Sequence, residues 1–175
     1  MQVERIHELD LTPADDAQIA GLMARCFDTD FGGRSFFQQR HHLRLVLRDG
    51  SKIIAHMALD FRAIRIGRDL CDVVGLAEVG TDPDYRGQGL ASVLMNAAID
   101  EAKASFADFF VLFGDRPLYA GSGFRRVPND AIYVTMEGAR TGEVVERSTQ
   151  ALMVLPVGEK SWEDAVVVDL MGHKF

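Results

Sequence analysis

One glycine-rich stretch carries residue types that could bind an anion. It reads GTDPDYRGQGLA over residues 80–91, between a strand-forming run and a run typical of a helix. Gly87 and Gly89 can adopt backbone conformations that other residues resist, so consecutive N–H groups can converge on one anion. The following helix would add the partial positive charge of its N-terminus, and Arg86 adds a formal charge. The stretch therefore predicts a phosphate-binding loop; the alternative is a tight strand-to-helix turn without a ligand.

Two common nucleotide-binding motifs fit this stretch poorly. A dinucleotide fingerprint needs G-x-G-x-x-G, and Ser92 stands at the third glycine position. The acidic residue expected about 20 positions later would be Asp108, which begins the next strand instead of ending it. A P-loop needs a Gly-Lys pair, which the sequence does not contain. Both nucleotide interpretations are therefore weakened.

The chain resembles the GNAT superfamily of acyl-CoA-dependent N-acyltransferases in two motifs. RGQGLA at residues 86–91 fits the family's R-x-x-G-x-G/A loop. LYAGSGF at residues 118–124 follows in the expected order and is similar to the family's F-Y-x-x-x-G-F segment. Phe113-Gly114-Asp115 resembles a subgroup that includes aminoglycoside-acetylating relatives. The resemblance covers roughly residues 43–127 and, more loosely, the first helix.

The resemblance implies acetyl-CoA as the co-substrate. In the family, the acyl-CoA diphosphate lies on the amides of the glycine-rich loop, and the pantetheine arm pairs with the preceding strand as an added strand would. We expect a gap between strands 70–79 and 108–113 to admit this arm, with a β-bulge at Gly80. The cofactor-binding residues implied in this way are Val79, Thr81, Arg86, Gly87, Gln88, Gly89, Leu90 and Ala91.

Acyl transfer to an amine also needs groups that handle protons. An ammonium with an unperturbed pKa of about 10.4 has no lone pair, so it must lose a proton before it attacks the thioester. By the resemblance, Tyr119 is the general acid that protonates the departing CoA thiolate; the alternative is a tyrosine packed in the core. For the base we consider Glu78, which should share a strand face with Leu76 and Gly80. An exposed carboxylate without a catalytic role is the alternative for Glu78.

The leading hypothesis is an N-acetyltransferase that moves the acetyl group of acetyl-CoA to a primary amine by direct attack. The amine acceptor, a small molecule or a peptide, is left open. One alternative is a fatty acyl transferase acting on an amino sugar, because LMVLPVG at residues 152–158 resembles a segment of nodulation N-acyltransferases. The other alternative is a non-catalytic module that binds acyl-CoA or has a regulatory role.

Composition argues against several other classes of protein. The 175 residues include 19 Lys plus Arg and 26 Asp plus Glu, and the resulting net charge of −7 disfavours nucleic acid as a partner. Two cysteines cannot build a four-cysteine zinc site, and the histidines lack ligand spacing, so no metal is expected. No segment approaches the roughly 18 apolar residues of a membrane span, and we expect a cytoplasmic protein. Exposed strand edges in the tail would allow a homodimer.

The elements that must position these residues predict an α+β fold with a mixed sheet. We expect one domain over residues 1–175: a GNAT-like, mostly antiparallel sheet with a central parallel β-loop-α-β unit and helices on both faces. Asp49-Gly50 and the turn at residues 67–69 predict antiparallel connections. Helices are predicted at residues 12–28, 36–40, 89–102 and 116–122, and strands at residues 3–9, 42–47, 52–66, 70–79, 108–113, from 124, at 132–136, 151–157 and 165–170.

Overall fold

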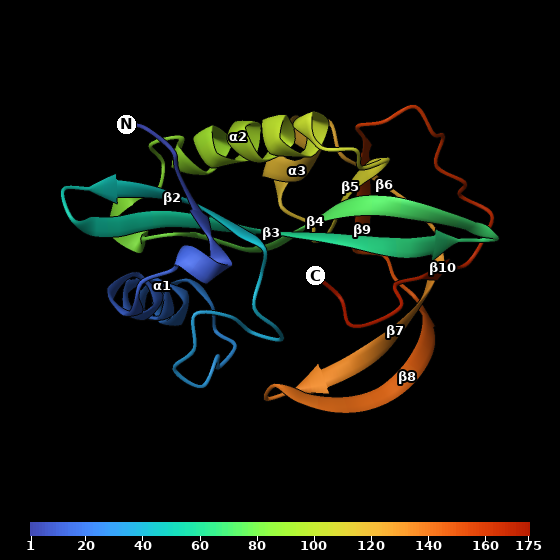
Figure 1. The fold of residues 1–175 in the computed structure, drawn as a ribbon, viewed down its shortest axis with the longest axis horizontal. Helices are drawn as coiled ribbons and strands as arrows, with labels where there is room; N and C mark the ends of the chain where they lie inside the picture. Colours follow the sequence, from blue (N-terminus) through green and yellow to red (C-terminus); the bar gives the residue numbers. More distant parts are fainter.

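The computed structural model describes residues 1–175, which form a curled ten-stranded sheet with helices on both sides (Figure 1). The strand order is β6-β9-β5-β4-β3-β10-β7-β8; β2 joins β3 on the edge that β10 also uses, and β1 joins β2. The strands are β1 (Glu4–His7), β2 (Leu43–Asp49), β3 (Lys52–Ile66), β4 (Asp69–Thr81), β5 (Phe109–Phe113), β6 (Arg125–Arg126), β7 (Asp130–Glu137), β8 (Arg140–Ser148), β9 (Leu152–Pro156) and β10 (Val168–Asp169). The helices are α1 (Pro13–Cys26), α2 (Leu90–Ala104) and α3 (Pro117–Gly121), with 3-10 turns η1 (Glu8–Asp10) and η2 (Pro83–Tyr85).

The sheet has the predicted mixture of strand directions. β2, β3 and β4 are antiparallel neighbours joined by short turns, in which Gly50 and Gly67 have φ of 57° and 60°. β4 and β5 run parallel, paired from Val73–Phe109 to Leu76–Leu112, because α2 carries the chain back between them. The α+β fold class is thus confirmed.

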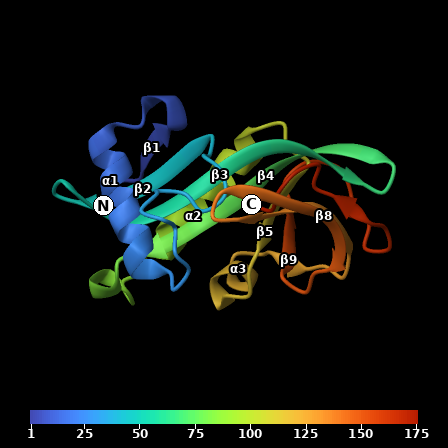
Figure 2. The same ribbon diagram turned by 90° about the horizontal axis from the view of Figure 1, so that it is seen from below.

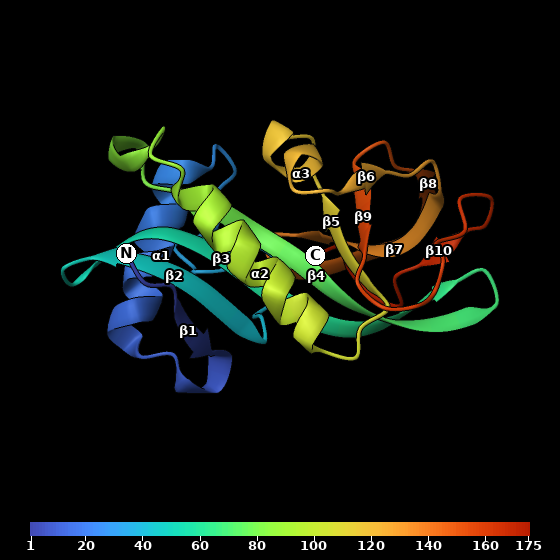
Figure 3. The same ribbon diagram turned by 90° about the horizontal axis from the view of Figure 1, so that it is seen from above.

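Helices cover the two faces of the sheet at different places (Figures 1 and 3). Thr12 caps α1 by accepting a hydrogen bond of 3.1 Å from Asp15 N, and Pro13 follows as its first residue. α1 packs Ile19, Leu22 and Met23 against β2 and β3 on one face. α2 packs on the other face, through the buried side chains of Leu94, Met95, Ala98 and Ala102. None of the helices is long and apolar enough to cross a membrane.

The C-terminal third curls back over the face opposite α2. β7 and β8 form a long hairpin that stands away from the central strands, and the tail runs between β3 and β7 (Figures 1 and 2). Val134 N donates a hydrogen bond of 2.8 Å to Gly172 O, which ties the tail to β7. The tail therefore ends over the middle of the sheet.

Two predicted elements need correction, and one strand was not predicted. Residues 36–40 form bends and no helix, because their backbone groups bind outward: Phe37 N donates to Glu78, and the neighbouring Ser35 O accepts from Arg44. The strand predicted at residues 165–170 shrinks to β10, where only Val168 and Asp169 pair. β8 was not predicted, because its side chains are almost all exposed and show no apolar alternation.

Candidate active site

The glycine-rich loop forms an open turn before α2. Gly87 and Gly89 have φ of 78° and 76°, in the left-handed region that favours glycine. No atom lies within 4 Å of a Cβ built on either residue, so backbone conformation and not crowding requires glycine here. Asp82 caps η2 by accepting a hydrogen bond of 3.2 Å from Asp84 N, which is a structural role.

The backbone amides of residues 87–91 donate no hydrogen bond within the chain. The first helical bonds come from Ser92 N and Val93 N, which both donate to Gly89 O. Gly89 is the N-cap and supplies no side-chain cap, and the first turn of α2 contains no acidic residue. Arg86 is exposed beside the loop. This arrangement suits an anion, because unpaired N–H groups and the helix dipole attract negative charge.

Beyond their short parallel ladder, β4 and β5 separate. Their pairing ends at Leu76 and Leu112, so residues 77–81 of β4 have no paired residue in β5. A β-bulge interrupts the register between β3 and β4: His56 faces Gly80, and Ala58 faces Ala77. The extra residue is therefore in the Glu78–Val79 step, and the predicted bulge at Gly80 is wrong. Bulges re-aim side chains, and they occur often next to active sites.

A cavity of about 890 Å³ fills this separation. It runs from the loop along the end of β4 to α3, residues 27–41 and the tail. The predicted site residues that line it are Glu78, Val79, Thr81, Arg86, Gly87, Gly89, Leu90, Ala91 and Tyr119. Gln88 is not among the lining residues. The structure thus brings most of the predicted site together.

Tyr119 lies on the wall of this cavity in α3. The residue is buried, with 8% of its surface exposed, and its hydroxyl has no hydrogen-bond partner within the chain. Its ring fits against Gly114, where a built Cβ would stand 2.5 Å from Tyr119 Cε2. Burial raises the pKa of Tyr119, so the phenol stays protonated at neutral pH. A protonated hydroxyl facing a cavity can donate a proton to a leaving group.

Glu78 occupies the bulge in a strained conformation, with φ of 52°. The bulge breaks the alternation of the strand: Leu76 belongs to the core beneath α2, whereas Gly80 faces Met23 and Cys26 of α1. The prediction that Glu78 shares one face with Leu76 and Gly80 is therefore wrong.

The Glu78 carboxylate reaches the cavity wall from the bulge, with 7% of its side chain exposed. One carboxylate oxygen accepts a hydrogen bond from Phe37 N. The other, Oε2, lies 2.8 Å from His41 Nε2. The contact with His41 is an ion pair whose angles are not those of a hydrogen bond.

Sequence reasoning missed His41 and Asp60, both of which line the cavity. His41 Nδ1 lies 3.2 Å from Asp60 Oδ2, on the side of the ring away from Glu78. Burial alone would lower the pKa of His41, but the carboxylates of Asp60 and Glu78 together raise it to about 9. His41, Asp60 and Glu78 are distant in sequence, and no local pattern links them.

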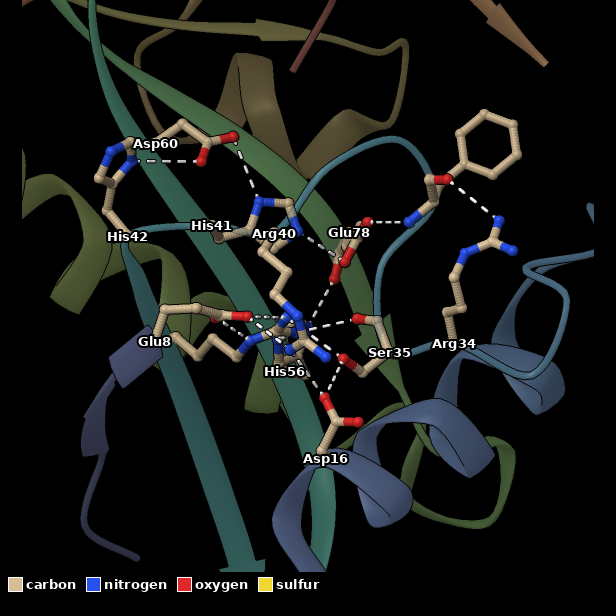
Figure 4. Close-up of polar contacts among 12 residues, drawn as sticks. Glu8, Asp16, Arg34, Ser35, Arg40, His41, His42, His56, Asp60 and Glu78 are labelled. Carbon is tan, nitrogen blue, oxygen red and sulfur yellow. Dashed lines mark hydrogen bonds and ion pairs between the residues drawn. The ribbon is translucent and has the colours of Figure 1, made fainter. Parts of the chain in front are cut away.

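A buried polar network lies next to Glu78 and contacts its backbone (Figure 4). Arg44 is fully buried; its Nε donates to Glu8 Oε2 at 2.7 Å, and its Nη1 to Ser35 O at 2.9 Å. His56 lies between Arg44 Nη1 at 3.3 Å and the Glu78 carbonyl at 2.9 Å. Burial, assisted by the Arg44 charge, lowers the pKa of His56 to about 3. Neutral His56 therefore accepts from Arg44 and donates to the bulge at Glu78.

The curled mixed sheet, the parallel strands that separate and the glycine-rich turn before a helix define a GNAT-type acyltransferase fold. A family profile described as "Acetyltransferase (GNAT) domain" matches residues 10–127. The chain belongs to the GNAT N-acetyltransferase family.

Individual relatives agree with this assignment. The chain is 26% identical over 140 residues to the uncharacterised N-acetyltransferase YhbS of Escherichia coli K12, which covers 77% of this chain and 83% of YhbS. The solved structure of E. coli YhbS with CoA superimposes with a TM-score of 0.62 at 22% identity, over 96% and 88% of the two chains. A Brucella melitensis GNAT acetyltransferase with acetyl-CoA gives a TM-score of 0.60 at 17% identity, over 95% of each chain. These structures are similar in fold.

Proposed function

We propose that the protein transfers the acetyl group of acetyl-CoA to a primary amine. The observation that carries this proposal is the row of unpaired amides at residues 87–91, at one end of the cavity. A diphosphate there would receive N–H groups and the charge of Arg86. The acetyl-CoA and CoA bound to the two structural relatives support this choice of cofactor.

The cofactor would extend from the loop along β4 toward Tyr119. Its pantetheine arm would enter where β4 and β5 separate and would contact the backbone near Val79. The Thr81 carbonyl already accepts hydrogen bonds from Cys26 Sγ at 3.2 Å and from Arg86 Nε at 3.3 Å. Of the two predicted residues, Val79 is therefore the stronger candidate for pairing with the pantetheine arm. The acyl group would then lie near the Tyr119 hydroxyl.

The proposed reaction removes two protons from the nitrogen and supplies one to the sulfur. Glu78 receives the first proton from the acceptor's ammonium, and the free nitrogen lone pair attacks the thioester carbonyl. The C–S bond breaks, and the CoA thiolate takes the proton of the Tyr119 hydroxyl. The new amide nitrogen then loses its second proton, which restores the Tyr119 hydroxyl. The burial of Tyr119 and the place of Glu78 on the same cavity wall support these roles.

A thiol-release assay tests this function. Purified protein is mixed with acetyl-CoA and, in turn, a polyamine, an aminoglycoside and a peptide with a free N-terminus. Amine-dependent release of CoA, with the acetylated amine found by mass spectrometry, is expected for at least one acceptor. Binding of acetyl-CoA without transfer to any amine would favour the non-catalytic alternative.

The fatty acyl alternative receives no support from the segment that suggested it. Residues 152–158 form β9 and its end, paired with β5 and β6, and none of them lines the cavity. We therefore expect palmitoyl-CoA to be a poorer donor than acetyl-CoA in the same assay.

Two further expectations belong to this proposal. Cys26 and Cys71 are both free thiols, which supports a reducing, cytoplasmic location. The exposed edge of β8 is where the predicted homodimer would form.

A further inference from the structure

His41 is held between two carboxylates on the cavity wall (Figure 4). Its Nδ1 lies 3.2 Å from Asp60 Oδ2, and its Nε2 lies 2.8 Å from Glu78 Oε2. The three side chains are 5% to 7% exposed. Asp60 comes from β3 and Glu78 from the bulge of β4, so the ring of His41 bridges two neighbouring strands.

The two carboxylates favour a proton on each ring nitrogen. A neutral imidazole has one N–H group, so one of its nitrogens would present a lone pair within 3.2 Å of a carboxylate oxygen. Buried His41 Nε2 and Glu78 Oε2 make no hydrogen bond, and their contact at 2.8 Å is an ion pair. An imidazolium satisfies both carboxylates, and the raised pKa of His41 agrees with that state.

The other charged groups around this ring do not replace its two partners. His42 accepts a hydrogen bond from Phe61 N and is largely exposed, with Nδ1 3.4 Å from Asp60 Oδ1. The remaining groups facing the cluster are Glu8 from η1, Arg40 from the preceding loop, Arg44 and His56 from β2 and β3, Arg62 from β3 and His173 from the tail. Arg40 and Arg44 are bound to Glu8, so they neutralise Glu8 and not Glu78.

Glu78 itself is fixed from three sides. His56 Nδ1 donates a hydrogen bond to the Glu78 carbonyl, Phe37 N donates one to Oε1, and His41 forms an ion pair with Oε2. A left-handed conformation at a glutamate is unfavourable, so it persists only where surrounding contacts determine it. His41 is the one of these contacts that carries charge.

We propose that His41, anchored by Asp60, is a positioning residue that holds the Glu78 carboxylate on the cavity wall, aimed at the acceptor's amine. The inference deepens the proposed function and rests on it for the identity of the proton donor. In the step it supports, an N–H bond of the acceptor's ammonium breaks, the proton moves to a free lone pair of the Glu78 carboxylate, and His41 keeps its own protons.

Histidine-selective ¹⁵N NMR tests the arrangement without any substrate. In the wild type, both ring nitrogens of His41 should stay protonated at pH 7 and lose a proton near pH 9. Glu78→Gln and Asp60→Asn should each move that titration to lower pH, because each removes one negative partner. His42→Asn is the matched control and should leave it unchanged. The proposal would be overturned if wild-type His41 is neutral at pH 7, or if its titration stays at the same pH in both Glu78→Gln and Asp60→Asn.

Steady-state kinetics of acetyl transfer tests the role in catalysis. In His41→Gln, kcat should fall while the affinity for acetyl-CoA stays unchanged, because the Glu78 carboxylate loses the contact that positions it. His42→Asn should keep the wild-type kcat. An unchanged kcat in His41→Gln, or a parallel loss of acetyl-CoA affinity and kcat, would contradict the proposal. If His41→Gln does not fold, Asp60→Asn serves in its place.

The two tests separate this inference from the proposed function. Absence of acetyl-CoA binding together with a His41 imidazolium would reject the function alone. Acetyl transfer together with a neutral His41 would reject the positioning role alone.

Discussion

The ring of Phe175 lies directly over the α-carbon of Gly75. A Cβ on Gly75 would stand 1.8 Å from Phe175 Cδ1, so the tail occupies space that any other residue at position 75 would need. Arg62 adds a second hold, because its guanidinium lies 4.0 Å from the centre of the Phe175 ring and its Nη2 donates to His173 O at 2.8 Å. The tail wall of the cavity thus depends on a glycine in β4.

Gly75→Ala should therefore destabilise the protein by about 1–3 kcal/mol, the usual cost of overpacking a well-filled site. Urea unfolding measures the change. Gly121→Ala is the control, because a Cβ there meets nothing within 4 Å and alanine suits the helix α3. Equal stability of Gly75→Ala and the wild type would show that Phe175 does not rest on β4 in solution.

Tyr119→Phe tests the proposed general acid. Loss of the hydroxyl should lower kcat by roughly 10²–10⁴-fold, the usual contribution of acid–base catalysis, and leave the affinity for acetyl-CoA unchanged. The comparison is Tyr133→Phe, which changes a tyrosine that does not line the cavity. Unchanged turnover in Tyr119→Phe would remove Tyr119 from the proton-transfer scheme.

The two buried histidines predict opposite pH dependences of stability. His41 has a pKa raised from 6.5 to about 9, so the folded state binds the extra proton and the stabilisation present below pH 6.5 is lost as the pH rises to 9. His56 has a pKa lowered to about 3, so the unfolded state binds the extra proton and stability is lost as the pH falls from 6.5 to 3.

Urea unfolding across pH 4 to 10 measures both effects. His41→Gln should flatten the decline between about pH 6.5 and 9 without changing the acid side, and His56→Gln should flatten part of the acid decline. A wild-type stability that is constant between pH 6.5 and 9 would contradict the charge state assigned to His41.

Local sequence patterns predicted those parts of the site that are built from neighbouring residues. The loop at residues 86–91 and α2 follow from glycine positions and helical periodicity, and the parallel pairing of β4 and β5 follows from the helix between them. Tyr119 came from a motif resemblance. In each case the signal lies within a few residues of the feature.

Features that depend on register or on distant contacts were not predictable. The bulge at Glu78 arises from the pairing of β3 with β4, and a one-residue change in register alters which face a side chain occupies. His41 gains its role only because Asp60 and Glu78 are brought to it by two strands. The packing of Phe175 on Gly75 brings together residues 100 positions apart, and no local pattern predicts this contact.

The central claim is that the backbone amides of residues 87–91 bind the diphosphate of acetyl-CoA. Isothermal titration calorimetry tests this claim most directly. Acetyl-CoA is compared with S-acetylpantetheine, which has the thioester arm but no diphosphate, on the wild type, Gly89→Ala and Gly138→Ala. Both glycines have positive φ and open surroundings, so both variants strain the backbone, but only Gly89 belongs to the loop. We predict that acetyl-CoA binds far more tightly than S-acetylpantetheine and that only Gly89→Ala reduces this difference. Equal affinity for the two thioesters, or no binding of acetyl-CoA by folded protein, would contradict the account.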